Sequence, residues 1–344
     1  MTLLQRLGIS HPIIQAPMAG TSTPAMAAAV SNARALGFLA LGSSNVESAR
    51  EAIAETKALT ARPFGLNFFC HATPKPDPAH DKAWIEYLRP EFTRFGAEPP
   101  AALTEIYKSF VDDDAMFDLV LETKPAVVSF HFGLPSQPKI DALKKTGIVL
   151  MATATCLSEA KRIQNAGIDA IVAQGYEAGG HRGIFDPAGH DDRLGMFSLV
   201  QVLMRAMDIP VIATGGIMDG AAINAVLKIG AAAAQLGTAF IGCPESAADA
   251  GYRKELASDA ANHTVMTAAV SGRPARCLAN RFTALDDRNH AAYPRAYDIG
   301  KALNAAAKAK GESGYGAQWA GQAAPLARSM PAAELIATLV REMH

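Results

Sequence analysis

Residues 210–220 read PVIATGGIMDG, an apolar run followed by two glycines. The run Pro210–Thr214 predicts a buried strand, and the apolar spacing over Ala221–Ile229 predicts a helix after it. A second apolar strand, Ala233–Leu236, follows this helix. A strand, a glycine turn, a helix and another apolar strand form the unit from which parallel α/β folds are built.

The same alternation extends over most of the chain. Several of the predicted strands are continuous apolar runs, as expected for strands that are covered on both faces. The eight predicted strands are Pro12–Pro17, Gly37–Leu41, Phe64–Phe69, Ala126–Phe132, Ile148–Ala152, Ala170–Gln174, Pro210–Thr214 and Ala233–Leu236. Helices are predicted at Thr23–Ala35, Val46–Thr60, Lys139–Lys145, Ser158–Ala166, Ser198–Met207 and Ala221–Ile229. This order predicts a closed (β/α)8 barrel, the TIM-barrel fold of the α/β class.

Two regions interrupt the alternation. Residues 70–123 combine six prolines with helical patches, which predicts a helical excursion after the third strand. The alternation also disappears over residues 260–323, which predicts a smaller, mainly helical cap that holds substrate. The barrel is therefore expected over residues 1–259, and residues 324–344 are expected to form a C-terminal helix that returns to it.

Composition excludes several classes of function. The 32 basic and 33 acidic residues nearly balance, and no basic cluster predicts nucleic-acid binding. The four cysteines are far apart and lack metal-ligand spacing, so neither a metal site nor a disulfide framework is expected. No targeting segment and no apolar run of membrane-spanning length is present, which predicts a soluble cytoplasmic protein.

Glycine turns after the last two strands predict a phosphate site. In (β/α)8 proteins phosphate is often held by these loops, at the C-terminal ends of the strands. Gly215, Gly216 and Gly237 expose backbone N–H groups, and Thr238 adds a hydroxyl donor. Two ordinary glycine turns are the alternative, but paired donor loops on successive strands favour a phosphate.

Residues after three other strands suit a flavin ring. An isoalloxazine needs amide and backbone hydrogen bonds at its polar edge and apolar contacts on its faces. Ala16, Pro17 and Met18 follow the first strand, Asn67 lies in the third, and Gln174 ends the sixth. Singly, a turn-capping Asn and a core Met have simpler explanations. Their convergence at one end of a barrel favours a shared ligand.

Histidines and a cap segment supply the candidates for chemistry. The sequence Gly179-Gly180-His181 presents a titratable ring beside a ligand. His131 is a second candidate, although a histidine inside a barrel mouth can also be a hydrogen-bonded structural group. Tyr293, Tyr297 and Lys301 are spaced at i, i+4 and i+8 and share one face of a predicted helix. The alternative is a lysine whose stem covers two half-buried tyrosines.

These motifs resemble those of the nitronate monooxygenase family, formerly called 2-nitropropane dioxygenases. The matching residues are Ala16–Met18, Asn67, Ser129–Gly133, Gln174–Gly183, Gly215–Ile217 and Gln235–Thr238. The segment from Tyr293 to Lys301 and the run that starts at Trp319 are similar to the bacterial class I pattern. Gly179-Gly180-His181 is also shared by related FMN-containing enoyl reductases, so it indicates the superfamily rather than the reaction.

The resemblance implies FMN as cofactor. It adds Gly179, Gly180, Gln235, Leu236 and Trp319 to the expected cofactor-binding residues. It implies that a nitronate gives one electron to FMN and that the substrate radical then reacts with dioxygen, yielding a carbonyl compound and nitrite. Propionate 3-nitronate is the implied substrate.

The resemblance also implies roles for the side chains. His181, if protonated, would pair with the nitronate oxygens, and His131, Tyr293, Tyr297 and Lys301 would complete the substrate site. With a neutral nitroalkane, His181 would instead act as the base that removes the α-proton.

Two alternatives remain open from sequence. One is an FMN-dependent NAD(P)H oxidoreductase that acts on an enoyl thioester or a quinone. The other is a barrel that binds a phosphate ligand and has no redox activity. The sequence leaves a homodimer open as well.

Overall fold

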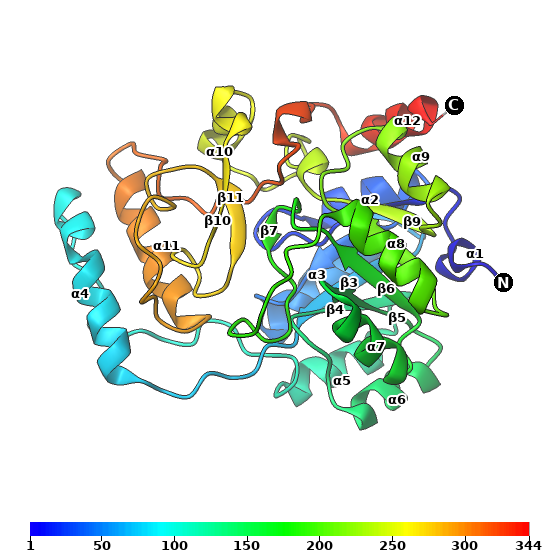
Figure 1. Ribbon diagram of the computed structural model, residues 1–344, viewed down its shortest axis with the longest axis horizontal. Helices are drawn as coiled ribbons and strands as arrows, with labels where there is room; N and C mark the ends of the chain where they lie inside the picture. Colours follow the sequence, from blue (N-terminus) through cyan, green and yellow to red (C-terminus); the bar gives the residue numbers. More distant parts are fainter. Residues whose placement is uncertain (344) are drawn as a thin grey trace.

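The computed structural model describes residues 1–343. Residue 344, the last of the segment expected to return to the barrel, lies outside the described residues. Eight parallel strands form the barrel on the right of Figure 1. They are β1 (Ile13–Gln15), β2 (Gly37–Ala40), β3 (Phe64–Phe69), β4 (Val127–His131), β5 (Val149–Ala154), β6 (Ala170–Gln174), β8 (Val211–Thr214) and β9 (Ala233–Leu236).

Hydrogen bonds between the first two strands close this sheet. The ladder runs in the order β1-β9-β8-β6-β5-β4-β3-β2, so β1 and β2 are its two ends. A parallel bridge joins Ile14 to Leu36, the residue before β2. The Gln15 N–H donates to the Leu36 carbonyl at 2.9 Å, and the Leu36 N–H donates to the Ile13 carbonyl at 3.1 Å. The predicted (β/α)8 barrel is therefore confirmed.

Helices surround the barrel on its outside (Figure 1). They are α2 (Pro24–Asn32), α3 (Val46–Leu59), α5 (Asp114–Thr123), α6 (Gln137–Lys145), α7 (Leu157–Asn165), α8 (Met196–Ala206), α9 (Gly220–Lys228) and α12 (Ala332–Glu342). A short N-terminal helix, α1 (Leu3–Leu7), precedes β1. Every residue of β3, β5 and β6 is buried, which explains why these strands read as continuous apolar runs.

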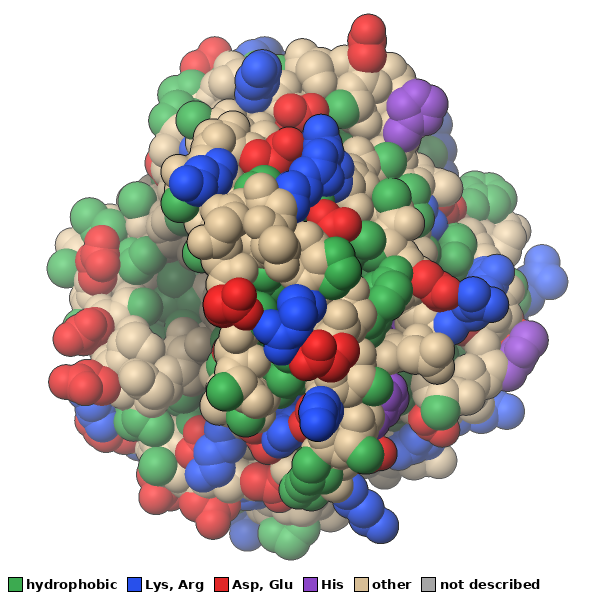
Figure 2. Space-filling model, turned by 90° about the vertical axis from the view of Figure 1, so that its left-hand side faces the viewer, with side chains coloured by type: hydrophobic (Ala, Val, Ile, Leu, Met, Phe, Trp, Pro, Cys, Tyr) green, Lys and Arg blue, Asp and Glu red, His purple; other side chains and the backbone are tan. Residues whose placement is uncertain are grey.

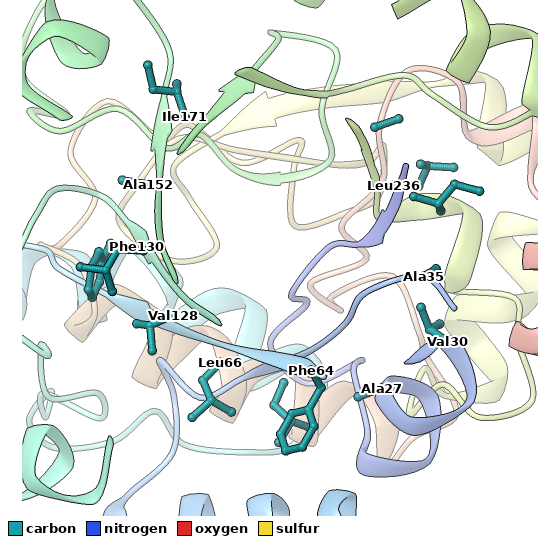
Figure 3. Close-up of a cluster of buried hydrophobic side chains, with 14 of the residues drawn as sticks. Ala27, Val30, Ala35, Phe64, Leu66, Val128, Phe130, Ala152, Ile171 and Leu236 are labelled. Carbon is teal, nitrogen blue, oxygen red and sulfur yellow. The ribbon is translucent and has the colours of Figure 1, made fainter. Parts of the chain in front are cut away.

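Successive residues of each strand enter two different cores. Ile13, Val128 and Ala152 belong to the larger core between strands and helices. Ile14 and Val127 belong instead to a core in the barrel interior, which also contains residues of α1. Figure 3 shows part of the larger core, where side chains of α2 and of several strands are gathered. This period of two is the one that strand geometry imposes.

The inward-facing positions become polar toward the C-terminal ends of the strands. On β6 the series is Ala170, Val172 and Gln174, and β3 carries Asn67 but is an exception at its end, where Phe69 follows. The same change gives Ser129 and His131 on β4, Thr153 on β5, Thr214 on β8 and Gln235 on β9. The fold therefore places a layer of polar side chains over an apolar barrel floor.

A second lobe covers this end of the barrel, on the left of Figure 1. It contains α4 (Pro78–Arg94), α10 (Ala250–Leu256), β10 (Thr264–Thr267), β11 (Ala275–Leu278) and α11 (Arg295–Lys308). The strand β7 (Gly180–His181), from the loop after β6, pairs with β11 and completes a three-stranded antiparallel sheet. Figure 2 shows the outer face of this cap, on which acidic and basic side chains are interspersed.

The cap differs in two ways from the predicted one. It is mainly helical, as predicted, but it also contains a small sheet, and it includes part of the excursion expected over residues 70–123. Trp84 and Leu88 of α4 pack in one buried cluster with Ile299 and Leu303 of α11. The excursion thus divides, because α4 joins the cap and α5 packs against the barrel. None of the helices described over residues 1–343 is both long and apolar enough to cross a membrane.

Candidate active site

A large cavity lies at the C-terminal ends of the barrel strands. Its volume, taken out to the open mouth, is about 1270 Å³. All residues expected to bind the cofactor line it, namely Ala16, Pro17, Met18, Asn67, Gln174, Gly179, Gly180, Gly215, Gly216, Gln235, Leu236, Gly237, Thr238 and Trp319. His131, His181 and Tyr297 line it as well.

One end of the cavity presents backbone donors without acceptors. Within residues 1–343, the amides of Gly215, Gly216, Gly237 and Thr238 donate to no protein group. Gly216 has φ +68°, a left-handed conformation that glycine adopts without strain. The Thr238 hydroxyl oxygen accepts a hydrogen bond from the Gly321 N–H at 3.0 Å, which leaves its own proton available. This donor set suits a phosphate.

Two amide side chains lie deeper in the cavity. The Asn67 amide nitrogen donates to the Ser129 hydroxyl at 2.8 Å, so its oxygen can accept a hydrogen bond from a ligand. Gln174 is engaged at both ends, because its nitrogen donates to the His181 carbonyl at 2.9 Å and its oxygen accepts from the Gly183 N–H at 2.7 Å. Gln174 therefore fixes the loop that carries His181.

Close backbone packing positions this loop. A Cβ atom on Gly179 would lie 2.5 Å from the backbone of Ala320 and Gly321, so only glycine fits. The next two residues form β7, and His181 pairs with Ala275 of β11. The loop is thus held between the barrel and the cap sheet.

The structure favours a neutral His181. Burial lowers the pKa of its imidazole to about 3, and His131 and Arg273 nearby act in the same direction. Nε2 lies 2.8 Å from the Ser271 hydroxyl oxygen, and that hydroxyl donates to the Arg273 carbonyl at 3.2 Å. We therefore assign the ring proton to Nε2, which leaves Nδ1 as an accessible lone pair with no hydrogen-bond partner among residues 1–343. Of the two states considered from sequence, the ligand-free site therefore favours the neutral ring.

His131 lines the cavity, but both of its ring nitrogens are occupied. Nδ1 lies 2.9 Å from the Thr153 hydroxyl, and Nε2 lies 3.1 Å from the His181 carbonyl. A carbonyl can only accept, so Nε2 carries the proton. Burial lowers the pKa of His131 to about 4. His131 thus supports the His181 backbone, the structural alternative considered from sequence, while its ring lines the cavity.

The cap supplies an aromatic wall. The Trp319 ring centroid lies 5.1 Å from that of His181 and 6.3 Å from that of Tyr297. Tyr293 does not line the cavity; it is 5% exposed and lies behind His181, with ring centroids 5.6 Å apart. Lys301 is also outside the cavity lining, with Nζ over the rings of Tyr107 and Tyr297. Of the three residues predicted from helical spacing, only Tyr297 faces the main cavity.

Comparison with known proteins identifies the family. The sequence model described as nitronate monooxygenase matches residues 1–342. The nitronate monooxygenase of Paraburkholderia phytofirmans is 60% identical over 99% of this chain and 94% of its own length. The chain belongs to the nitronate monooxygenase family. It is therefore an oxidoreductase, as predicted.

Two further members of the comparison agree with this family. The nitronate monooxygenase of Pseudomonas aeruginosa is 50% identical over 98% of this chain and 97% of its own length. The crystal structure of a nitroalkane oxidase from Streptomyces ansochromogenes superimposes with a TM-score of 0.88, at 38% identity over 99% of this chain and 97% of that one. The family likeness thus covers the barrel and the cap together.

Three residues around this family's cavity were not predicted from sequence. Tyr107 lines the cavity from the excursion, Ser271 holds His181, and the Arg273 guanidinium lies 4.2 Å from the Phe132 ring centroid. Phe132 itself has φ +74°, a conformation that costs a bulky residue strain. The only sequence signal was the Ser-Gly-Arg turn in an otherwise irregular region, and it does not indicate a role.

Behind Phe132 lies a shell of buried polar atoms without partners. Both ring nitrogens of His71, the Tyr293 hydroxyl and the Arg273 Nε atom are buried and form no hydrogen bond within residues 1–343. The His71 and Tyr293 rings meet edge to face at 4.9 Å. Burial lowers the pKa of His71 to about 4, and Arg273 lowers it further. The buried Arg273 guanidinium beside this shell disfavours a second positive charge on His181.

Proposed function

We propose that this chain is an FMN-dependent nitronate monooxygenase that oxidises propionate 3-nitronate with dioxygen to a carbonyl compound and nitrite. One observation carries the proposal. Backbone amides in two loops, Gly215–Gly216 and Gly237–Thr238, donate to no group within residues 1–343 and line the same cavity as His181. A phosphate-bearing cofactor and a small substrate can therefore meet in one space. Membership of the nitronate monooxygenase family gives the class of substrate.

The residues present fit FMN. The amides of Gly216 and Gly237 would hold its phosphate, and Met18, Asn67 and neighbouring backbone would contact the ring. FMN, when bound, supplies the redox chemistry that no side chain provides. The protein's part is to bind and orient the substrate, to exclude water and to place a proton.

His181 would place that proton through Nδ1. A nitronate is already an anion, so its binding beside Nδ1 would favour proton uptake there and turn the lone pair into a hydrogen-bond donor. The Ser271 contact would keep the other ring nitrogen fixed during this change. Trp319 and Tyr297 would close the cavity over the substrate carbon.

A second candidate activity is the use of neutral nitroalkanes. The unprotonated Nδ1 of His181 favours it, because a neutral imidazole with a free lone pair can remove an α-proton. The two substrates then differ in one step. The nitronate needs no base, whereas the nitroalkane requires His181 as the base.

The test uses the purified protein. We expect a bound flavin released as FMN, and dioxygen consumption with nitrite release when propionate 3-nitronate is added. His181→Asn should retain the flavin and lose about 100-fold or more of kcat with the neutral nitroalkane, with a smaller loss for the nitronate. Full activity of His181→Asn with both substrates contradicts the assigned role.

Anaerobic mixing with NADH or NADPH separates the alternatives. Rapid bleaching of the flavin spectrum would favour the NAD(P)H oxidoreductase acting on an enoyl thioester or a quinone. A stable oxidised spectrum supports the monooxygenase. A colourless protein that takes up no FMN would favour the remaining alternative, a barrel that binds a phosphate ligand and has no redox activity.

A further inference from the structure

A second cavity adjoins the main one on the cap side. Its volume, taken out to its opening, is about 750 Å³. Five residues line both cavities, namely Ala19, Thr21, Tyr252, Tyr297 and Trp319. The rings of Tyr297 and Trp319, 6.3 Å apart between centroids, therefore belong to the wall that the two cavities share.

One face of α11 supplies the polar lining of this second cavity. Lys301, Asn304 and Lys308 line it at positions i, i+3 and i+7, which lie within about 60° of each other around a helix. The Asn304 side-chain oxygen is buried and has no hydrogen-bond partner within residues 1–343. A buried polar group without a partner indicates a position for a ligand or an ordered water molecule.

The ammonium groups on this face differ in their pairing. Lys301 forms no ion pair with any carboxylate among residues 1–343, and its Nζ lies 4.8 Å from the Tyr107 ring centroid and 5.4 Å from that of Tyr297. Burial lowers its pKa, with Asp298 acting in the opposite direction. Lys308 pairs with Asp249 at 2.6 Å, and both side chains are about half exposed.

The charge of this lining is positive. Its charged side chains are Lys301, Lys308 and Asp249, two positive and one negative. Asp249 is held in place because it also caps α10, by accepting a hydrogen bond from the Tyr252 N–H at 2.8 Å. Asn67, Gln174 and Gly216 line the main cavity and do not line the second one.

We infer that the second cavity is the access route of the substrate and that its α11 face selects small dianions, namely nitronates that carry a carboxylate at the far end. The inference rests on the proposed function. Lys308 attracts the dianion at the opening, Asn304 lies along the path, and the unpaired Lys301 stands beside the shared wall that contains Tyr297 and Trp319. Positively lined clefts raise the association rate of anions by focusing the field.

Kinetics at low salt test the route. Lys308→Gln should lower kcat/KM for propionate 3-nitronate about fivefold and for the singly charged ethyl nitronate about twofold, with kcat unchanged. Asn304→Asp has nearly the same shape and should lower kcat/KM for the dianion more than tenfold. These differences should vanish in 1 M NaCl, where the Debye length is about 3 Å.

Two further variants serve as controls. Lys254→Gln removes the same charge from α10, outside both cavities, and should leave kcat/KM unchanged. Asp249→Asn keeps an N-cap on α10 but frees Lys308, so kcat/KM for the dianion should rise about twofold. Equal responses of Lys308→Gln and Lys254→Gln would overturn the inference.

Equilibrium binding provides a readout that does not depend on turnover. Succinate has the shape and two charges of propionate 3-nitronate, and butyrate is its singly charged counterpart. Calorimetry on the purified holoenzyme should show that succinate binds about tenfold more tightly than butyrate. In Lys308→Gln this ratio of affinities should fall to about threefold. Equal affinities for the two acids overturn the inference. Absence of nitronate turnover in the unmodified enzyme would instead contradict the proposed function, with the succinate result still deciding the selectivity.

Discussion

The Nε2 atom of His181 lies 2.8 Å from the hydroxyl oxygen of Ser271. His181 belongs to the loop after β6 of the barrel, and Ser271 lies in the turn between β10 and β11 of the cap. The pairing of β7 with β11 brings these segments together. The side chain best placed for chemistry is therefore presented by the barrel and oriented by the cap.

Replacement of Ser271 by alanine tests this orientation. Ser271→Ala removes the acceptor of the Nε2 proton, so the imidazole is free to change tautomer and to rotate. We expect kcat to fall about 10- to 100-fold, part of what a positioned acid or base contributes. The FMN content should stay the same, because Ser271 does not line the main cavity. Ser258→Ala, which removes a hydroxyl elsewhere in the cap, is the control, and equal kcat values for the two variants would refute the role.

Acid should destabilise the protein through its buried histidines. Burial lowers the pKa of His71 and His131 to about 4 and that of His181 to about 3. Below pH 6.5 the unfolded chain therefore takes up protons that the folded chain does not. The free energy of unfolding is then highest above pH 6.5 and falls toward pH 4, by about 2 to 3 kcal/mol per histidine at pH 4.5. Urea unfolding at several pH values measures this loss.

A variant of His71 isolates one histidine of the three. His71→Phe keeps an aromatic ring next to Phe132 and Tyr293 and removes two buried nitrogens that have no partner. We expect a shallower dependence of stability on pH and no loss of stability at pH 7.5. His263→Asn, at an exposed position, should keep the original dependence. An unchanged slope in His71→Phe would show that His71 does not titrate as described.

The barrel could be predicted closely because its strands are buried on both faces. The predicted bounds of Phe64–Phe69, Ala170–Gln174 and Ala233–Leu236 are those of β3, β6 and β9. These parallel strands are long enough to be recognised in the sequence as apolar runs, and the glycines that follow them mark their ends. The cavity lining could be predicted for the same reason, since the ends of parallel strands meet on one side.

The cap was predicted, but its sheet and its inclusion of α4 could not be, because the contacts that form them join distant segments. α4 packs against α11, and Arg295 at the start of α11 bonds to Asp81 of α4, more than 200 residues away in sequence. The strands β10 and β11 are four residues each, and β11 buries Arg276, so neither shows an alternating pattern. The role of Ser271 depends on this pairing and left no trace in the sequence around it.

The phosphate end can be tested at Gly216. Its φ of +68° is readily adopted by glycine, less readily by asparagine and only with strain by valine. A Cβ there meets only the Glu177 Cβ at 3.6 Å, so strain rather than a clash decides the effect. We expect Gly216→Val to weaken FMN binding at least tenfold and Gly216→Asn to weaken it much less. Fluorescence titration of the apoprotein measures both, and equal affinities for the two variants would argue against this geometry.

The assignment of α4 to the cap leads to a prediction for Leu88. Its side chain is fully buried in the cluster that joins α4 to α11. Leu88→Ala should lower the free energy of unfolding by about 2 to 5 kcal/mol, whereas Leu59→Ala, at a side chain that is 48% exposed, should change it by less than about 0.5 kcal/mol.

Leu88→Ala should also affect substrate turnover, which involves the cap, without affecting FMN binding to the barrel. Because α11 carries Tyr297 and Lys301, loosening it should lower kcat/KM for the nitronate while FMN stays bound to the barrel residues. Limited proteolysis should also cleave the segment between β3 and α5 faster in Leu88→Ala. Release of FMN in parallel with the loss of kcat/KM would show instead that α4 supports the barrel, and that the two lobes do not divide the work between cofactor and substrate.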